Sequence, residues 1–304
     1  MGEGESGLNA APPVLPGLKN LAFVGEGGMS TVWKAWDESL GRYVAVKILK
    51  PELVANGEDL RLFVKEERTM AQINHEGIVR SFDLRRMGGL WYYIMEFVDG
   101  YNFGDLLRRK QHLGEADCLL IAESVAVALD YAWNEHGLVH SDIKPENIMI
   151  TQEGVVKLTD LGLASLYTGA AGAHDAGDHI LGTPAYISPE QVYGDVELDC
   201  RADIYSLAAT IYHLATGRVL FPGLDDEGMI RAQCDEAKAA VDPRRYRPQL
   251  STGFVQLLEA MLVKDRDGRV ANWSDVYEMC RLVEGGTSFK PRASAGASSL
   301  RLER

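Results

Sequence analysis

Short runs of β-branched and aromatic residues, separated by polar and glycine-containing stretches, fill the chain from about residue 18 to residue 98. Runs of this kind are typical of β-strands. We expect five strands of one antiparallel sheet, at LAFVGEG (21–27), TVWKAW (31–36), YVAVKILK (43–50), IVRSFDL (78–84) and WYYIMEFV (91–98). The segment 58–73 interrupts them, and its apolar residues recur at helical spacing, which predicts one helix among the strands.

After Gly100 the pattern becomes mainly helical. We expect helices over 116–137, 202–217, 254–263 and 273–283, the first two ending at glycines. Two short apolar runs, NIMIT (147–151) and VVKLTD (155–160), predict a small hairpin. The pattern therefore indicates an α+β chain with two lobes, a small antiparallel β lobe with one helix over about 18–98 and a larger helical lobe over about 99–285.

The two ends of the chain lack such periodicity. Residues 1–17 are rich in Gly, Ala and Pro, and residues 286–304 are basic and rich in Ser and Ala, so we expect a flexible lead and a flexible tail. Whether the tail leads to a further domain stays open. The first residues lack the apolar core of a secretory signal, and no run approaches the roughly 18 apolar residues of a membrane helix.

Composition narrows the class of protein. Lys and Arg number 31 against 44 Asp and Glu, a formal net charge of −13, which argues against nucleic-acid binding as the main function because that requires a basic surface. The four cysteines are scattered without a CxxC pair, as is typical of reduced thiols. We expect a cytoplasmic protein with no membrane segment in this chain.

A glycine-rich segment lies between the first two expected strands. It reads Val24, Gly25, Glu26, Gly27, Gly28, Met29, Ser30, Thr31 and Val32. Glycines let backbone amides approach a phosphate without interference from a Cβ. They do not open a helix, as a dinucleotide-binding motif requires. A glycine-rich hairpin that binds no ligand is the alternative.

Lys47 ends the run Val-Ala-Val-Lys in the third expected strand. A lysine between apolar residues is costly to desolvate unless an anion or a carboxylate meets it. Glu66 on the expected helix is the candidate partner, and Glu67 is its rival. The alternative is a lysine whose ammonium group reaches water at the strand edge.

The segment LVHSDIKPEN (138–147) follows the long expected helix and concentrates chemically active side chains. Asp142 can accept a hydroxyl proton, Lys144 can neutralise a phosphate, and Asn147 can bind a metal through its amide oxygen. Asp160, at the end of the expected hairpin, supplies a hard carboxylate oxygen suited to Mg²⁺.

In order and spacing, these segments resemble the eukaryotic-type protein kinase family, most closely its bacterial Ser/Thr members. The likeness runs from about 18 to 283 and extends to motifs downstream of Asp160. These are Gly182-Thr183-Pro184-Ala185-Tyr186, Ser188-Pro189-Glu190, Asp203-Ile204-Tyr205-Ser206, and Arg269 as the partner of Glu190.

The resemblance implies a role for each matching residue. Lys47 would hold the α- and β-phosphates of ATP and pair with Glu66, while Asp142 would orient the substrate hydroxyl and accept its proton. Asn147 and Asp160 would hold Mg²⁺, and Lys144 and Thr183 are typical of Ser/Thr rather than Tyr kinases. The remaining contacts to ATP would come from Val24, Gly25, Glu26, Gly27, Gly28, Met29, Ser30, Val32, Ala45, Met95, Glu96 and Val98.

Three departures from the family pattern bear on regulation. The usual arginine before the catalytic aspartate is Ser141, and a basic residue often found after the Asp-Leu-Gly motif is Ser165. The segment 163–181 is rich in Gly and Ala, and its only hydroxyl groups lie near its start. A phosphate clamp needs both an arginine donor and a phosphorylated acceptor. We therefore predict activity that does not depend on phosphorylation of this segment.

The resemblance implies phosphorylation of Ser and Thr on protein substrates, with autophosphorylation. Two alternatives remain. A catalytically inactive scaffold is disfavoured because the lysine and both aspartates are present. A small-molecule kinase of related fold generally lacks the segment from Gly182 to Glu190, which would form a platform for a peptide.

Overall fold

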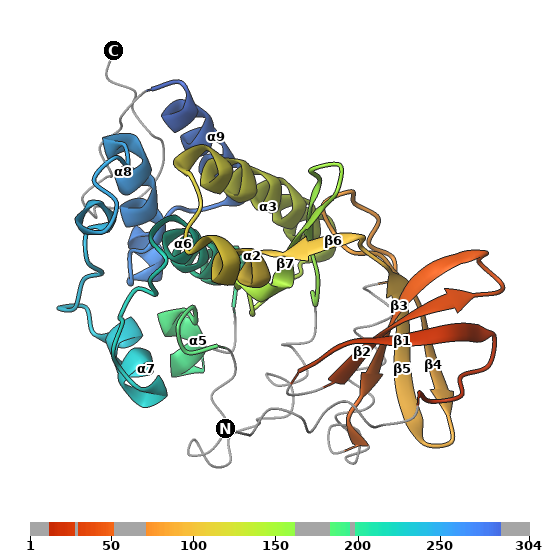
Figure 1. Cartoon of the computed structure of the whole chain (residues 1–304). Coiled ribbons are helices and arrows are strands. Elements are labelled where there is room, and N and C mark those ends of the chain that lie inside the picture. Colours follow the sequence, from red (N-terminus) through yellow and green to blue (C-terminus); the bar gives the residue numbers. More distant parts are fainter. Residues whose placement is uncertain (1–11, 28–29, 52–70, 162–182, 195–197, 287–304) are drawn as a thin grey trace, which may run out of the picture. The chain divides into compact units, whose positions relative to one another are not determined.

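The computed structural model describes residues 12–27, 30–51, 71–161, 183–194 and 198–286. Its contacts divide the chain into two compact units. Unit 1 takes Met1–Gln72 and Arg80–Val98, and unit 2 takes Ile73–Val79 and Asp99–Arg304. The predicted α+β class is confirmed, since unit 1 is built on an antiparallel sheet and unit 2 is mainly helical (Figure 1).

Unit 1 contains the five expected strands in one antiparallel sheet of order β1-β2-β3-β5-β4. The strands are β1 (Leu18–Glu26), β2 (Ser30–Asp37), β3 (Arg42–Leu49), β4 (Ser81–Met87) and β5 (Leu90–Glu96). Successive side chains of a strand point to opposite faces, so Val44, Val46 and Ile48 of β3 share one face. There they belong to a buried cluster with Trp33 and Ile94. Burial of this apolar face stabilises the sheet.

The expected helix over 58–73 lies almost entirely outside the described residues. Residues 73–79, which the sequence analysis assigns to the first lobe, group with unit 2. The reason is backbone pairing, because Ile78 forms a parallel bridge with Leu158 and the Val79 N–H donates to the Leu158 carbonyl at 2.8 Å.

Unit 2 contains the four expected helices and the expected hairpin, together with shorter elements that the pattern did not predict. Its helices are α2 (Phe103–Lys110), α3 (Glu115–His136), α5 (Pro189–Tyr193), α6 (Cys200–Thr216), α7 (Asp226–Cys234), α8 (Thr252–Met261) and α9 (Trp273–Glu284). The 3-10 turns are η2 (Pro145–Asn147), η3 (Pro243–Arg245) and η4 (Arg266–Gly268), and the small sheet joins β6 (Gly100–Asn102), β7 (Ile148–Thr151) and β8 (Val156–Leu158).

The two long helices end where glycine makes the left-handed conformation inexpensive. Gly137 after α3 and Gly217 after α6 have φ values of 62° and 70°. Helix α6 is buried along almost its whole length, and α3 packs against both α6 and α9 (Figure 1). None of the helices within the described ranges has the length and apolarity needed to cross a bilayer. This helical core is the support for the segment that follows α3.

Candidate active site

The segment 138–147 connects α3 to β7 and has no regular structure before the turn η2. Its backbone groups therefore need partners outside helices and sheets. Ile143 of the segment and Thr210 of α6 are both buried and hold it in place. Ile143 is 1% exposed, and its carbonyl accepts a hydrogen bond of 3.2 Å from Thr210 Oγ1 on α6. The core helix thus supports the segment from one side.

Asp203, near the start of α6, anchors the same segment. Its Oδ2 accepts from the backbone N–H of His140 at 2.6 Å, and its Oδ1 accepts from the N–H of Ser141 at 2.8 Å. Burial raises the pKa of Asp203 to about 6, while His140 and the two N–H groups act in the opposite direction. The carboxylate group thus accepts hydrogen bonds from two consecutive backbone N–H groups that have no partner in a helix or a sheet.

His140 is fully buried and links the segment to the end of β8. Its Nε2 lies 3.0 Å from the carbonyl oxygen of Thr159, and its Nδ1 accepts from the Asp142 N–H at 3.3 Å. A carbonyl only accepts and an N–H only donates, so both contacts hold together when the ring hydrogen is on Nε2. His140 therefore orients the backbone of Asp142 as a buried hydrogen-bonding residue.

Three side chains converge on the carboxylate of Asp142. Lys144 Nζ donates to Oδ2 at 2.6 Å and Asn147 Nδ2 to the same oxygen at 3.0 Å. Thr183 Oγ1 lies 3.2 Å from Oδ1 and accepts from Lys144 Nζ at 3.0 Å. Asp142 and Lys144 keep 28% and 24% of their side chains exposed, so both can be reached from solvent. A carboxylate, an ammonium group and a hydroxyl group are thus gathered at one accessible point.

Helix α5 lies next to this group and is itself firmly anchored. Glu190 forms a two-pronged ion pair with Arg269, at 2.6 and 3.1 Å, with both side chains almost fully buried. This is the pairing that the resemblance implied. The next residue of the helix is Gln191, whose Nε2 donates to the Ser141 carbonyl at 2.7 Å. The contact ties α5 directly to the residue before Asp142.

Asn147 and Asp160 have the donor chemistry that Mg²⁺ prefers. The Asn147 amide nitrogen is bonded to Asp142, which directs its amide oxygen elsewhere, and the Asn147 carbonyl accepts from the Thr159 N–H at 3.0 Å. Asp160 follows at once, in the left-handed conformation with φ 62°. An amide oxygen and a carboxylate on adjoining backbone are hard oxygen ligands, so these residues fit a bound Mg²⁺.

In unit 1, the sheet face opposite the apolar cluster carries the residues expected to contact ATP. Val32 pairs with Lys47, and Ala45 pairs with Met95. Directly opposite residues share a face, as do alternate residues of one strand, so these four side chains lie on one surface of the sheet. Lys47 is only 5% exposed there.

The other residues predicted to contact ATP are divided between described and undescribed parts of the chain. Gly25 pairs with Val32 beside a bulge in β1, the Gly27 N–H donates to the Ser30 carbonyl at 2.8 Å, and Glu26 pairs with Lys50 at 2.8 Å. Val24 is largely exposed, while Glu96 and Val98 lie at and after the end of β5. Gly28, Met29 and Glu66 lie outside the described residues.

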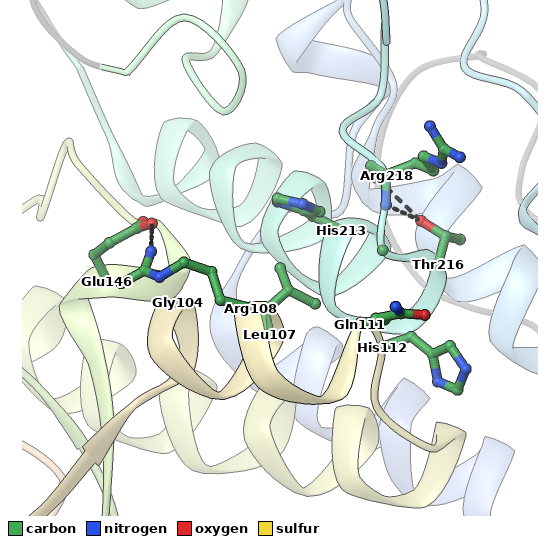
Figure 2. A pocket seen from close by; sticks show the side chains of 10 residues that line it. Gly104, Leu107, Arg108, Gln111, His112, Glu146, His213, Thr216 and Arg218 are labelled. Carbon is green, nitrogen blue, oxygen red and sulfur yellow. Dashed lines mark hydrogen bonds and ion pairs between the residues drawn. The ribbon is translucent and has the colours of Figure 1, made fainter. Parts of the chain in front are cut away.

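A cavity of about 490 Å³ opens beside η2 and is lined by α2 and the end of α6. Figure 2 shows Glu146 of the 138–147 segment facing Arg108 of α2, with 3.9 Å between the charged atoms. His213 borders the same cavity, and its Nδ1 lies 2.7 Å from the Tyr186 hydroxyl. The cavity therefore adjoins the 138–147 segment through Glu146, and its wall contacts Tyr186 through His213.

Sequence reasoning did not assign the residues that hold the segment from a distance. Asp203 was seen only as part of a motif, although a charged residue inside an otherwise apolar helix already indicates a buried partner. Gln191 was not singled out. Its position three residues after Ser188 matches a capping box, which predicts a hydrogen-bonding role at a helix start. The contacts with Ser141 depend on distant parts of the chain.

Comparison with protein families and curated proteins gives a consistent result. The family described as "Protein kinase domain" matches residues 18–280. A probable serine/threonine-protein kinase of Clostridium perfringens is 36% identical over 245 residues, which cover 81% of this chain and 35% of the relative. Serine/threonine-protein kinase PknA of Mycobacterium tuberculosis is 36% identical over 269 residues, covering 87% and 60%. The chain thus spans about a third to three fifths of the length of these relatives.

Solved structures give the same likeness at the level of the fold. The kinase domain of Mycobacterium tuberculosis PknI superposes with a TM-score of 0.73 at 25% sequence identity, covering 91% of this chain and 99% of that domain. The predicted fold and the resemblance to bacterial Ser/Thr kinases are both confirmed.

Proposed function

The chain belongs to the protein kinase family, and on that premise we propose that it transfers the γ-phosphoryl group of ATP to Ser and Thr hydroxyls of protein substrates. The observation that carries the proposal is the convergence of Lys144, Asn147 and Thr183 on the accessible carboxylate of Asp142. Phosphoryl transfer depends mainly on positioning and on neutralising charge. This group of side chains can do both.

The proposed chemistry assigns one task to each side chain. Asp142 orients the substrate hydroxyl and accepts its proton as the hydroxyl oxygen forms a bond to phosphorus and the bond to the leaving oxygen breaks. Lys144, 2.6 Å from Asp142 and 3.0 Å from Thr183, balances the negative charge of the transferred group. Asn147 and Asp160 would hold Mg²⁺, which neutralises phosphate charge when bound.

For the nucleotide, we assign the surface of unit 1 that carries Val32, Ala45, Lys47 and Met95. Apolar side chains suit the base, and a buried ammonium group suits a phosphate. The glycine-rich segment, including Gly25, Gly27 and Ser30, would cover the phosphates through its backbone. Glu66 stays the proposed partner of Lys47.

Independence from phosphorylation of the segment 163–181 is a finer part of the proposal. Ser141 has no guanidinium group with which to capture a phosphate. The 138–147 segment instead has permanent partners in Asp203 and Gln191. These bonds need no modification to form, which supports an enzyme that is active as synthesised. Autophosphorylation is a further part of the proposal.

Transfer of radiolabelled phosphate from ATP to a basic protein and to the chain itself tests the function. Asp142→Asn keeps the size of the side chain and removes the proton acceptor, so we expect transfer to fall about 100-fold or more. Equal transfer by both proteins, or none by the unsubstituted chain with Mg²⁺ present, contradicts the proposal.

Joint alanine substitution of Ser165, Tyr167 and Thr168 tests the finer claim, with a rate expected within a few-fold of the original. A large loss with the fold intact, shown by unchanged thermal unfolding, contradicts independence from phosphorylation.

A further inference from the structure

The carbonyl of Ser141 faces a single partner in the described part of the chain, the side-chain amide of Gln191. Gln191 Nε2 donates to this carbonyl at 2.7 Å. The carbonyl belongs to the peptide that joins Ser141 to Asp142, so its direction determines where the Asp142 backbone starts. A group from α5 thus bonds the peptide immediately before the proposed proton acceptor.

The amide of Gln191 works in two directions at once. Its Oε1 accepts from Ser188, at 3.1 Å from the backbone N–H and 2.9 Å from the hydroxyl, while its Nε2 serves Ser141. Glutamate of the same length accepts but cannot donate, and lysine donates but cannot accept. The two bonds can therefore be separated by substitution.

The position of Gln191 is well defined. It lies in the first turn of α5, next to the buried ion pair of Glu190 with Arg269, and Ser188 is fully buried. Two anchored neighbours leave the amide little freedom, so its bond to Ser141 acts as a fixed support.

The peptide between Ser141 and Asp142 is held at both ends. Gln191 bonds its carbonyl, and His140 Nδ1 accepts its N–H at 3.3 Å. Ser141 has φ 64°, a left-handed conformation that costs a non-glycine residue free energy and persists only where surrounding contacts impose it. The N–H of Ser141 is held by Asp203. Among the described residues, Gln191 supplies the one side-chain hydrogen bond to the carbonyl.

We propose that Gln191 is a positioning residue, which orients the Ser141–Asp142 peptide and through it the Asp142 carboxylate. This inference rests on the proposed kinase function and extends it. Because Gln191 reaches the carbonyl of residue 141 and not its side chain, the support works with serine at that position. Through this bond the buried ion pair that anchors α5 also supports the 138–147 segment, and no phosphorylated residue is needed for it.

Three substitutions separate this role from a structural one. Gln191→Glu keeps the bonds to Ser188 and loses the bond to Ser141. Gln191→Lys keeps a donor for Ser141 and loses the bonds to Ser188. Gln191→Met loses both without adding charge. Gln152→Glu, in an exposed turn of unit 2, is the matched charge control.

We expect kcat to fall about 10- to 100-fold in Gln191→Glu and Gln191→Met, since small displacements of reacting groups are costly. The KM for ATP should stay within about twofold, and Gln191→Lys should retain most of the kcat. Gln152→Glu should match the unsubstituted chain. Equal kcat losses in Gln191→Glu and Gln191→Lys, or a loss that follows the thermal unfolding temperature, overturns the proposal.

Hydrogen exchange of the peptide covering 138–147 gives a second measurement that needs no catalysis. We expect faster exchange in Gln191→Glu and Gln191→Met, and exchange close to the original in Gln191→Lys. Unchanged exchange in Gln191→Glu overturns the positioning role. Absence of phosphate transfer by the unsubstituted chain, with exchange following this pattern, rejects the kinase function and leaves the positioning of the peptide supported.

Discussion

The sheet of unit 1 and the 138–147 segment of unit 2 are held in opposite ways. In the sheet, three of the four strand pairs join consecutive strands and the fourth joins β3 to β5. Each pair forms several backbone hydrogen bonds, and many similar apolar contacts add to the stability. The segment depends on a few polar bonds from distant residues, chiefly Asp203, Gln191 and Thr210. A sheet of many equivalent contacts loses stability gradually, whereas a segment with few supports can lose its geometry through one substitution.

The largest effect on stability is expected at the ion pair that anchors α5. Arg269→Met leaves the Glu190 carboxylate buried without its partner and removes donors from several carbonyls. Loss of one partner of a buried pair costs about 3–5 kcal/mol. Urea unfolding should show this loss directly.

The exposed pair of Arg231 with Glu227 provides the control. Its side chains are 69% and 75% exposed, so Arg231→Met should change the free energy of unfolding by less than about 0.5 kcal/mol. Similar losses of unfolding free energy in Arg269→Met and Arg231→Met would contradict the claim that burial makes the α5 ion pair important for stability.

Asp203→Asn should have the next largest effect and should act on activity more than on stability. The asparagine amide can accept from one of the two N–H groups and meets the other with a donor. An unsatisfied donor costs about 1–3 kcal/mol, offset by relief from burying a charge. We expect phosphate transfer to fall about 100-fold, measured beside the unfolding midpoint.

Ile94→Val in the sheet of unit 1 is the counterpart of Asp203→Asn, because it is expected to change stability and leave activity unchanged. Ile94 is fully buried in the apolar cluster, and removing one methyl group there costs about 0.5–1.5 kcal/mol. The rate per folded molecule should stay within about twofold. If Ile94→Val reduces the rate as much as Asp203→Asn does, the two regions do not differ in the way described.

The last expected effect concerns His213 and appears only when the pH is lowered. Burial lowers the pKa of His213 from 6.5 to about 4. As the pH falls below 6.5, His213 becomes protonated in the unfolded chain and stays neutral in the folded protein. The free energy of unfolding therefore decreases on acidification until the pH reaches about 4, where the folded form is protonated too. Between pH 7 and pH 5 the loss should be about 2 kcal/mol.

His213→Gln keeps an acceptor for the Tyr186 hydroxyl and cannot titrate. The difference in unfolding free energy between the two proteins should therefore shift in favour of Gln as the pH falls from about 7 to 5. A difference independent of pH contradicts a neutral buried His213.

The alternation of apolar and polar residues and the positions of glycines were sufficient to predict most of the fold. The five strands of unit 1 and the helices ending at Gly137 and Gly217 follow from residue pattern, because those elements are stabilised by contacts along one face. The short helices α2, α5 and α7 were missed, since a turn or two of helix has little periodicity to detect.

The sequence by itself determined which chemical groups are present, namely Asp142, Lys144, Asn147 and Asp160, and their order along the chain. It also determined that the region around them is flanked by a long helix and a hairpin. Local spacing is enough for such conclusions, because strand and helix periods are properties of neighbouring residues.

The tertiary structure alone decided how those groups are held. Asp203 and Gln191 reach the peptides on either side of Ser141 from positions about 60 and 50 residues away. Contacts over such separations depend on how whole helices pack, and no period in the sequence encodes them. The hydrogen bonds that hold the peptides on either side of Ser141 are therefore a property of the tertiary structure.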